Sequence, residues 1–263
     1  MRSAESKKPA LRIVFSRPMM RRLGSVVLIV IAVGAIALNV ILFDRARQYY
    51  TEVNAVRLDP VGLNSFAAET GSSRRSDKPL IVFFGDSRAA GWPAPNIGRF
   101  EFVNRGIEAQ TSAQAVLRFD AHVTPLRPRI VIVQVGINDL KTIPLFPDYA
   151  DAIIAACKTN IREIVTRSTS LGAQVIVTTI FPIGDFPLER KVFWSPAIAT
   201  AIDEVNAYLR SLAAPNVFVF DAYAILSNNV QLRTEYAQDE LHLNADGYAA
   251  LNRELEPVLA TIR

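Results

Sequence analysis

The chain has 263 residues, half of them hydrophobic, which is enough for one globular domain of roughly 200 residues and an appendage. Its net charge of +4 is concentrated in residues 1–22, which hold seven Lys/Arg and one acid, so the remainder is slightly acidic. This balance excludes a basic nucleic-acid-binding domain. The single cysteine, Cys157, excludes an intrachain disulfide, and we expect it in the core of a helix.

A transmembrane helix is predicted for residues 23–43, which contain no charged side chain. At about 1.5 Å per residue this stretch matches the roughly 30 Å hydrocarbon core of a bilayer. The basic tail (residues 1–22) precedes it, so the positive-inside rule places the N-terminus in the cytoplasm. We therefore expect a single-pass membrane protein whose domain is extracytoplasmic, either periplasmic or at the cell surface.

Three other interpretations of this segment have some support in the sequence. A cleaved signal peptide is compatible with the small residues of Ala35-Ile36-Ala37. A twin-arginine export signal would use Arg21-Arg22, although paired arginines also arise from the positive-inside bias. A buried core helix would carry a polar stripe. The long basic region and the apolar continuation to Phe43 favour an anchor.

Residues 44–77 are mixed and polar and end in Gly, Ser, charged residues and a Pro, which indicates a juxtamembrane connector. From residue 78 to 263, short apolar runs alternate with stretches of helical period, as in repeated βα units. This pattern, without a repeat of fixed period, predicts a three-layer α/β/α sandwich around a parallel sheet. The expected strands are residues 80–84, 102–104, 130–135, 174–180 and 217–221.

Helical spacing of apolar residues marks two buried helix faces, within residues 153–164 and 198–212. Gly172 is placed to end the first of these helices. Asn244 is placed to begin a last helix, which Pro257 is expected to kink or split.

Ligands of open parallel sheets bind beyond the carboxyl ends of the strands, so the residues that follow each strand are the candidates for chemistry. Gly85-Asp86-Ser87 follows the first strand, where Gly permits a tight turn that presents Ser87 as a nucleophile. Taken alone, the tripeptide is more typical of an ordinary turn in which Asp86 or Ser87 caps the next helix, and the motifs at the other strand ends change this balance.

Two further strand ends offer hydrogen-bond donors. Gly106, in Asn104-Arg105-Gly106, could bring its main-chain N–H close to a substrate, and Asn138, in Gly136-Ile137-Asn138-Asp139, could stabilise an oxyanion with its amide. The structural alternatives are a glycine turn and an Asx-type cap.

A base for the serine is predicted near the C-terminus, in Asp239-Glu240-Leu241-His242. The spacing lets the Asp239 carboxylate reach the His242 imidazole, fix its tautomer and stabilise its charged form. The only other histidine, His122, has no such motif beside it and is interpreted as a surface or helix-packing residue.

Together the motifs GDS, NRG, GIND and DELH resemble the four blocks of the SGNH hydrolase (GDSL-like lipase/acylhydrolase) family, over about residues 79–260. The resemblance implies a flavodoxin-like five-stranded parallel sheet, Ser87 facing His242, and an oxyanion hole built from the Ser87 N–H, the Gly106 N–H and the Asn138 amide. Two positions depart from the family pattern: Arg88 replaces the usual Leu, and Ala109 stands where many relatives have Gly.

Candidate substrate contacts are Arg88, for an anionic group, and Phe186 and Trp194, for an acyl or sugar pocket in an aromatic loop. The alternatives are a solvated arginine and a loop that packs over its own helix. Metal chemistry at Asp86, Asp139, Asp239 and His242 was considered. The paired His or Cys spacing of transition-metal sites is missing from the sequence, so no metal and no cofactor are predicted.

The sequence therefore predicts a serine hydrolase that cleaves ester bonds of a small-molecule, lipid or glycan substrate and contacts the membrane through residues 23–43, with no nucleic-acid partner. One alternative is an O-acyltransferase that passes the acyl group from Ser87 to a sugar hydroxyl. Another is a non-catalytic envelope assembly or binding protein with the same fold.

Overall fold

The computed structural model of the protein describes residues 17–67, 77–186, 190, 194–228 and 231–262. Most of the predicted basic tail, residues 68–76 of the predicted connector, and residues 187 and 193 of the aromatic loop lie outside the described residues. The chain divides into two compact units, Met1–Leu58 and Asp59–Arg263, and each is described by itself.

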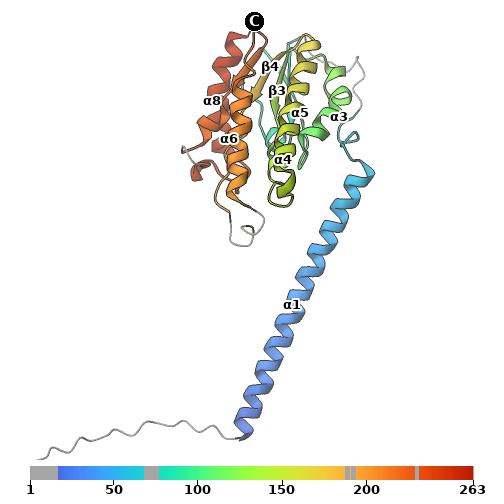
Figure 1. The fold of residues 1–263 in the computed structure, drawn as a ribbon, viewed down its shortest axis with the longest axis vertical. Helices are drawn as coiled ribbons and strands as arrows, with labels where there is room; N and C mark the ends of the chain where they lie inside the picture. Colours follow the sequence, from blue (N-terminus) through green and yellow to red (C-terminus); the bar gives the residue numbers. More distant parts are fainter. Residues whose placement is uncertain (1–16, 68–76, 187–189, 191–193, 229–230, 263) are drawn as a thin grey trace, which may run out of the picture. The chain divides into compact units, whose positions relative to one another are not determined.

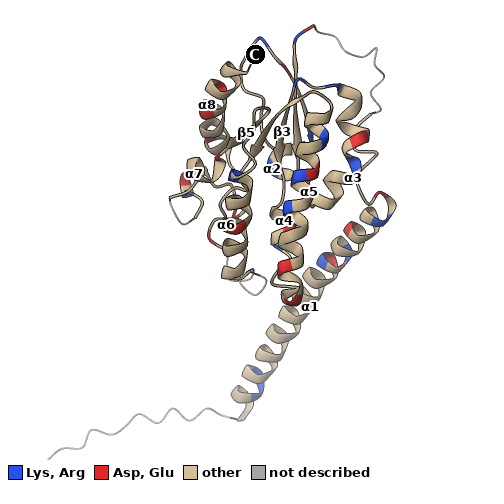
Figure 2. Ribbon diagram, turned by 45° about the horizontal axis from the view of Figure 1, so that its top comes forward, with Lys and Arg blue, Asp and Glu red and all other residues tan. Residues whose placement is uncertain are grey.

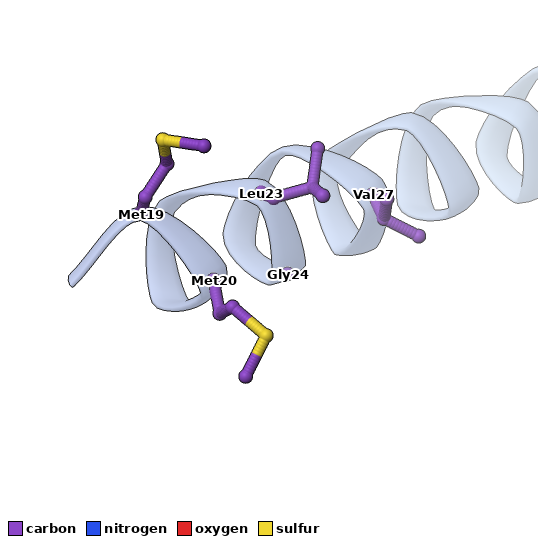
Figure 3. A pocket seen from close by; sticks show the side chains of 5 residues that line it. All are labelled: Met19, Met20, Leu23, Gly24 and Val27. Atoms are coloured by element: carbon purple, nitrogen blue, oxygen red, sulfur yellow. The ribbon is translucent and has the colours of Figure 1, made fainter. Parts of the chain in front are cut away.

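The first unit is one long helix, α1 (Arg17–Leu58). It is long and apolar enough to cross a membrane, and its large apolar side chains are exposed. Charged residues lie toward its two ends and leave its middle uncharged (Figure 2). Near its start, the side chains of Met19, Met20, Leu23 and Val27 project outward from the helix (Figure 3). This helix is a candidate membrane span that includes the predicted residues 23–43.

The helix continues past Phe43, through the first part of the predicted connector. Side-chain pairs one turn apart support the extension: Arg47 bonds Asp44 at 3.2 Å, and Gln48 bonds Glu52 at 3.1 Å. The second unit then begins at Asp59, well before the domain start predicted at residue 78. The described part of residues 59–77 thus belongs to the globular unit.

The second unit contains a five-stranded parallel sheet in the order β2-β1-β3-β4-β5, which is the flavodoxin-like order and confirms the predicted fold (Figure 1). Each strand lies at or within a few residues of its predicted position. The strands are β1 (Leu80–Gly85), β2 (Glu101–Gly106), β3 (Ile130–Gln134), β4 (Gln174–Thr178) and β5 (Val217–Phe220).

Helices cover both faces of the sheet and complete the three layers (Figure 1). They are α2 (Ser87–Ala90), α3 (Ser112–His122), α4 (Ile137–Leu140), α5 (Ala150–Ser170), α6 (Pro196–Arg210), α7 (Ala222–Leu226) and α8 (Ala245–Thr261), with 3₁₀ turns at Thr124–Leu126, Pro147–Tyr149 and Thr234–Tyr236. Pro257 lies inside α8 and does not split it.

Two apolar cores follow from the alternation of side chains along the strands. Val82 and Phe84 of β1 pack in the core on the α3, α5 and α6 side, which also holds the fully buried Cys157. Ile81 and Phe83 pack in the core on the α7 and α8 side. Burial on both faces explains why the strands read as continuous apolar runs in the sequence.

Candidate active site

The turn between β1 and α2 presents Ser87, and its shape requires glycine. Gly85 has a φ of +154°, and a Cβ there would lie 1.7 Å from the carbonyl oxygen of Gln134. Asp86 then caps the short helix, because its Oδ1 accepts the Arg88 N–H at 2.9 Å. Ser87 is therefore the first residue of α2, at the carboxyl end of the central strands.

The structure brings Ser87, His242 and Asp239 together. The Ser87 Oγ lies 3.1 Å from the His242 Nε2. On the other side of the ring, the His242 Nδ1 lies 2.8 Å from one Asp239 carboxylate oxygen and 3.0 Å from the other. A hydroxyl, an imidazole and a carboxylate in this order form the arrangement in which the histidine can accept the serine proton.

The Asp239 carboxylate is held in its charged form by its neighbours. Burial acts to raise the pKa of Asp239, but hydrogen bonds from the His242 ring and from the N–H groups of Leu241 and His242 outweigh it and keep that pKa below its usual value. The ionised carboxylate fixes Nδ1 of the ring as the protonated nitrogen, which leaves Nε2 free to act on Ser87.

Asn138 and Asp139 both lie in α4, the short helix that follows β3, and both are buried. The Asn138 Nδ2 donates to the carbonyl oxygen of Gln110 at 2.9 Å. Asp139 accepts two hydrogen bonds from Ser112, from the N–H at 2.8 Å and from the Oγ at 2.6 Å. Asp139 thus holds the start of α3, whereas the Asn138 amide keeps a second N–H for a ligand.

The predicted role of Gly106 is contradicted by its hydrogen bonding. Its N–H donates to the Asn104 Oδ1 at 2.8 Å, so it is already paired. Gly106 is required for packing instead, because a Cβ there would lie 2.1 Å from the main-chain nitrogen of Ala90. The same Asn104 side chain donates to the carbonyl oxygen of Ala89 at 2.7 Å and so ties β2 to the end of α2.

A different main-chain donor follows on the same loop. Ala109 has a φ of +59°, a left-handed conformation that is uncommon for a residue other than glycine. Among the described residues, the N–H groups of Ser87 and Ala109 have no hydrogen-bond acceptor. The conformation also gives a physical reason why glycine would be usual at this position.

Neither prediction for Arg88 is correct, since its side chain has no exposed surface and cannot contact solvent or substrate. Its Nε donates to the carbonyl oxygen of Leu241 at 2.8 Å, its Nη1 to that of Phe181 at 3.0 Å and its Nη2 to that of Pro182 at 3.3 Å. Burial lowers the Arg88 pKa to about 10, against the attraction of Asp86. Arg88 joins the serine-bearing turn to the loop that carries His242.

Asp86 is the carboxyl group that interacts with the Arg88 charge, and its surroundings disfavour its ionised form. It is fully buried, and within the described chain its Oδ2 has no hydrogen-bond partner. Burial raises the Asp86 pKa to about 6, although the charge and N–H of Arg88 act to lower it.

Phe186 and Trp194 stack on each other, with ring centroids 4.0 Å apart and planes at 20°. Trp194 also packs against the core on the α3, α5 and α6 side, as in the loop-packing alternative. In the part of the chain that the structure describes, no group of three or more acidic, His or Cys side chains is placed to bind a metal ion.

Sequence reasoning missed two buried residues that hold this edge of the sheet, Gln110 and Arg118. The Arg118 Nη1 and Nη2 donate to the carbonyl oxygens of Arg105 (2.9 Å) and Gly85 (2.8 Å), at the ends of β2 and β1. Its Nε donates to the Gln110 Oε1. The only signal for Arg118 in the sequence is a charged residue on a helix face that is otherwise apolar, four residues before His122.

Comparisons with known proteins agree with the fold. One similar structure is a protein of Bacteroides fragilis assigned as an acylhydrolase, with 25% identity and a TM-score of 0.58, covering 72% of this chain and 93% of its own. Another is a GDSL-like lipase of Bacteroides thetaiotaomicron, with 22% identity and a TM-score of 0.56, covering 82% of this chain and 97% of its own. An acetyl xylan esterase shares the fold at 19% identity, with a TM-score of 0.56, and covers 68% of this chain and 99% of its own. None of the curated proteins matches the chain. Residues 64–250 match the family that the four motifs predicted, and the chain therefore belongs to the GDSL-like Lipase/Acylhydrolase family.

Proposed function

We propose that this protein is a serine esterase that cleaves ester-linked acyl groups through an acyl-Ser87 intermediate. The observation that carries the proposal is the contact of 3.1 Å between the Ser87 Oγ and the His242 Nε2, with Asp239 on the far side of the ring. Membership of a family of lipases and acylhydrolases supports the same reaction class.

In the proposed mechanism, the His242 Nε2 takes the Ser87 proton while the Oγ attacks the ester carbonyl carbon. The Ser87 N–H and the Asn138 amide are the donors for the resulting oxyanion, and the unpaired Ala109 N–H is the candidate for the third place predicted for Gly106. The tetrahedral species then collapses, the carbon–oxygen bond to the alcohol breaks, and His242 protonates the leaving alkoxide. Water, activated by His242, attacks the acyl-serine and releases the carboxylic acid.

The test is labelling of the detergent-solubilised chain with a fluorophosphonate, read by intact mass and by mapping of the adduct. We expect one adduct on Ser87, none in Ser87→Ala, and a rate of ester hydrolysis reduced by several orders of magnitude in both Ser87→Ala and His242→Ala. Ser170→Ala removes an exposed serine at the end of α5 and serves as the matched control. Labelling or turnover that persists in Ser87→Ala would refute the mechanism.

Short acyl esters and O-acetylated glycans are the substrates to test first. A shared fold with an acetyl xylan esterase supports this choice. Acetate release from acetylated xylan oligosaccharides, followed with and without sugar acceptors, separates hydrolysis from acyl transfer. Free acetate as the sole product supports the esterase, and an acetylated acceptor supports the transferase.

The proposal places the enzyme at a membrane through α1, with its N-terminus cytoplasmic and its second unit extracytoplasmic. Two features of α1 support this placement: its middle is apolar, and its large apolar side chains are exposed. Extraction with alkaline carbonate should leave the protein in the membrane fraction, and its intact mass should include residues 1–22. A mature chain that begins after Ala37 would identify the segment as a cleaved signal peptide instead.

A further inference from the structure

The stretch that follows α1 in the chain, residues 59–66, forms a compact turn, which we call the linker turn. The Asp59 carboxylate accepts the N–H of Leu63 at 2.8 Å and the N–H of Asn64 at 2.9 Å, which closes the turn. Gly62 has a φ of +73°, a conformation that favours glycine. The linker turn therefore has a defined backbone shape, although its sequence reads as a polar connector.

The linker turn is bound to the second unit mainly through its own carbonyl oxygens. Side chains on α3 and on the loop before it reach these oxygens: Gln114 Nε2 to Pro60 (2.6 Å), Gln110 Nε2 to Val61 (2.7 Å) and His122 Nε2 to Leu63 (3.2 Å). At its far end, the Phe66 ring lies under the Arg105 guanidinium, 4.6 Å from it, and meets the His122 ring edge-on at 5.1 Å.

Gln110 connects the linker turn to the candidate oxyanion hole. The side chain is buried, with its Nε2 on Val61 and its Oε1 on Arg118, so both ends of its amide are fixed. Its main-chain carbonyl accepts the Asn138 Nδ2 at 2.9 Å. The preceding residue, Ala109, has a left-handed conformation, so the chain turns immediately before the Gln110 carbonyl group.

We propose that the linker turn is a positioning element of the active site, acting through Gln110 as a positioning residue for the Asn138 amide. The inference rests on the proposed function, because it assigns to Asn138 the stabilisation of an oxyanion. The linker turn holds the Gln110 side chain in place through the Val61 carbonyl oxygen. This fixes the direction of the Gln110 main-chain carbonyl, which in turn orients the Asn138 amide. The segment that joins the candidate membrane helix to the enzyme thereby contributes to catalysis.

Close packing makes this connection sensitive to the shape of the linker turn. A Cβ at Gly62 would lie 2.9 Å from the Gln110 Nε2, 2.9 Å from the Ile107 Cδ1 and 3.0 Å from the Ser65 Oγ, at a φ that disfavours any side chain. Gly62→Ala thus moves the linker turn against Gln110 without changing a residue of the triad. Gly98→Ala is the matched control, because Gly98 is exposed, lies outside the linker turn and has no atom within 4 Å of an added Cβ.

The experiment uses the full chain in detergent, with p-nitrophenyl acetate turnover, fluorophosphonate labelling and hydrogen exchange measured on the same samples. Removal of one oxyanion donor by Asn138→Ala should lower kcat by about 10²- to 10³-fold. We expect Gln110→Ala and Gly62→Ala to lower kcat by about tenfold while KM changes less than about twofold, since only part of that stabilisation is lost. Exchange should rise in residues 136–140 in both variants, and Gly98→Ala should change neither kcat nor this exchange.

A double-mutant cycle separates positioning from general stability. If Gln110 acts through Asn138, then Gln110→Ala should cost less than about twofold in kcat when Asn138 is already alanine. A full tenfold loss in that background, or unchanged exchange at 136–140 in Gly62→Ala, would overturn the proposal. A wild-type chain that neither turns over nor labels would refute the proposed function alone. In that case the exchange at 136–140 still decides whether the linker turn controls the Asn138 segment.

Discussion

Replacement of Arg88 by leucine is expected to weaken both the fold and the active site, because one buried guanidinium joins three segments. Arg88 follows Ser87 in α2, and its Nε bonds the carbonyl oxygen of Leu241, the residue before His242. Its Nη1 bonds the carbonyl oxygen of Phe181, just beyond β4. The leucine side chain would fill much of the space and leave these carbonyl groups without a donor.

The magnitude follows from the two shorter hydrogen bonds, of 2.8 and 3.0 Å. A buried carbonyl left without a partner costs about 1–3 kcal/mol, so two of them cost about 2–6 kcal/mol. Burial of the leucine side chain returns about 1.5–3 kcal/mol, and loss of the Arg88 charge removes the attraction that stabilises ionised Asp86. The midpoints of these ranges leave a net loss of about 2 kcal/mol, which lowers Tm by roughly 4–8 °C for a domain of this size.

The assay is thermal unfolding of the detergent-solubilised chain followed by ester turnover at a temperature where each variant is folded. Arg88→Leu should also lose about tenfold in kcat, since the His242 segment is no longer tied to α2. Arg88→Lys keeps the charge beside Asp86 but offers one donor group. Its Tm and kcat should therefore lie between those of the wild type and those of Arg88→Leu. Equal Tm values for Arg88→Leu and the wild type would show that the three carbonyl contacts contribute nothing to stability.

Two further predictions concern the carboxylates of the site. Asp239→Asn should lower kcat by about 10²- to 10⁴-fold while leaving Tm nearly unchanged, because the imidazole loses the charge that orients it; unchanged kinetics would assign Asp239 to structure. Asp86 has a pKa raised to about 6 in the folded state from 3.8, so its stabilising contribution is present below about pH 4 and is lost as the pH rises through 6. The difference in unfolding free energy between the wild type and Asp86→Asn, measured by urea unfolding, should therefore change with pH. The wild type should lose on the order of 3 kcal/mol relative to the variant from pH 4 to 7. A difference that stays constant over this range would refute the raised pKa.

The sheet could be predicted from the sequence because its central strands, β1, β3 and β4, are buried on both faces. Runs such as residues 80–84 and 130–135 need no knowledge of their partners to be recognised, and their strand ends carry the motifs. Ser87 and His242 followed from the same reasoning, since the fold brings strand ends to one edge and the chain has only two histidines.

Gly106 and the linker turn show why other features could not be predicted. The Gly106 N–H lies at the expected edge, but Asn104, two residues earlier in the same motif, competes for it. The linker turn docks through the carbonyl oxygens of Pro60, Val61 and Leu63. Main-chain carbonyl groups are the same in every residue, so no pattern of side chains encodes this contact.

The two buried arginines share a physical logic that explains how the site is held in shape. Arg88 and Arg118 are both withdrawn from water, and burial lowers the pKa of each, to about 10 and about 9. Among the described residues, their hydrogen bonds go to main-chain carbonyl oxygens, to the Gln110 amide oxygen and to the His122 ring, and none goes to a carboxylate. Desolvation of each guanidinium costs free energy, and each hydrogen-bonds loops that the sheet does not connect. Arg88 does so on the His242 side of Ser87, and Arg118 does so on the Asn138 side. The geometry of the candidate active site at this edge is therefore held by two buried cations.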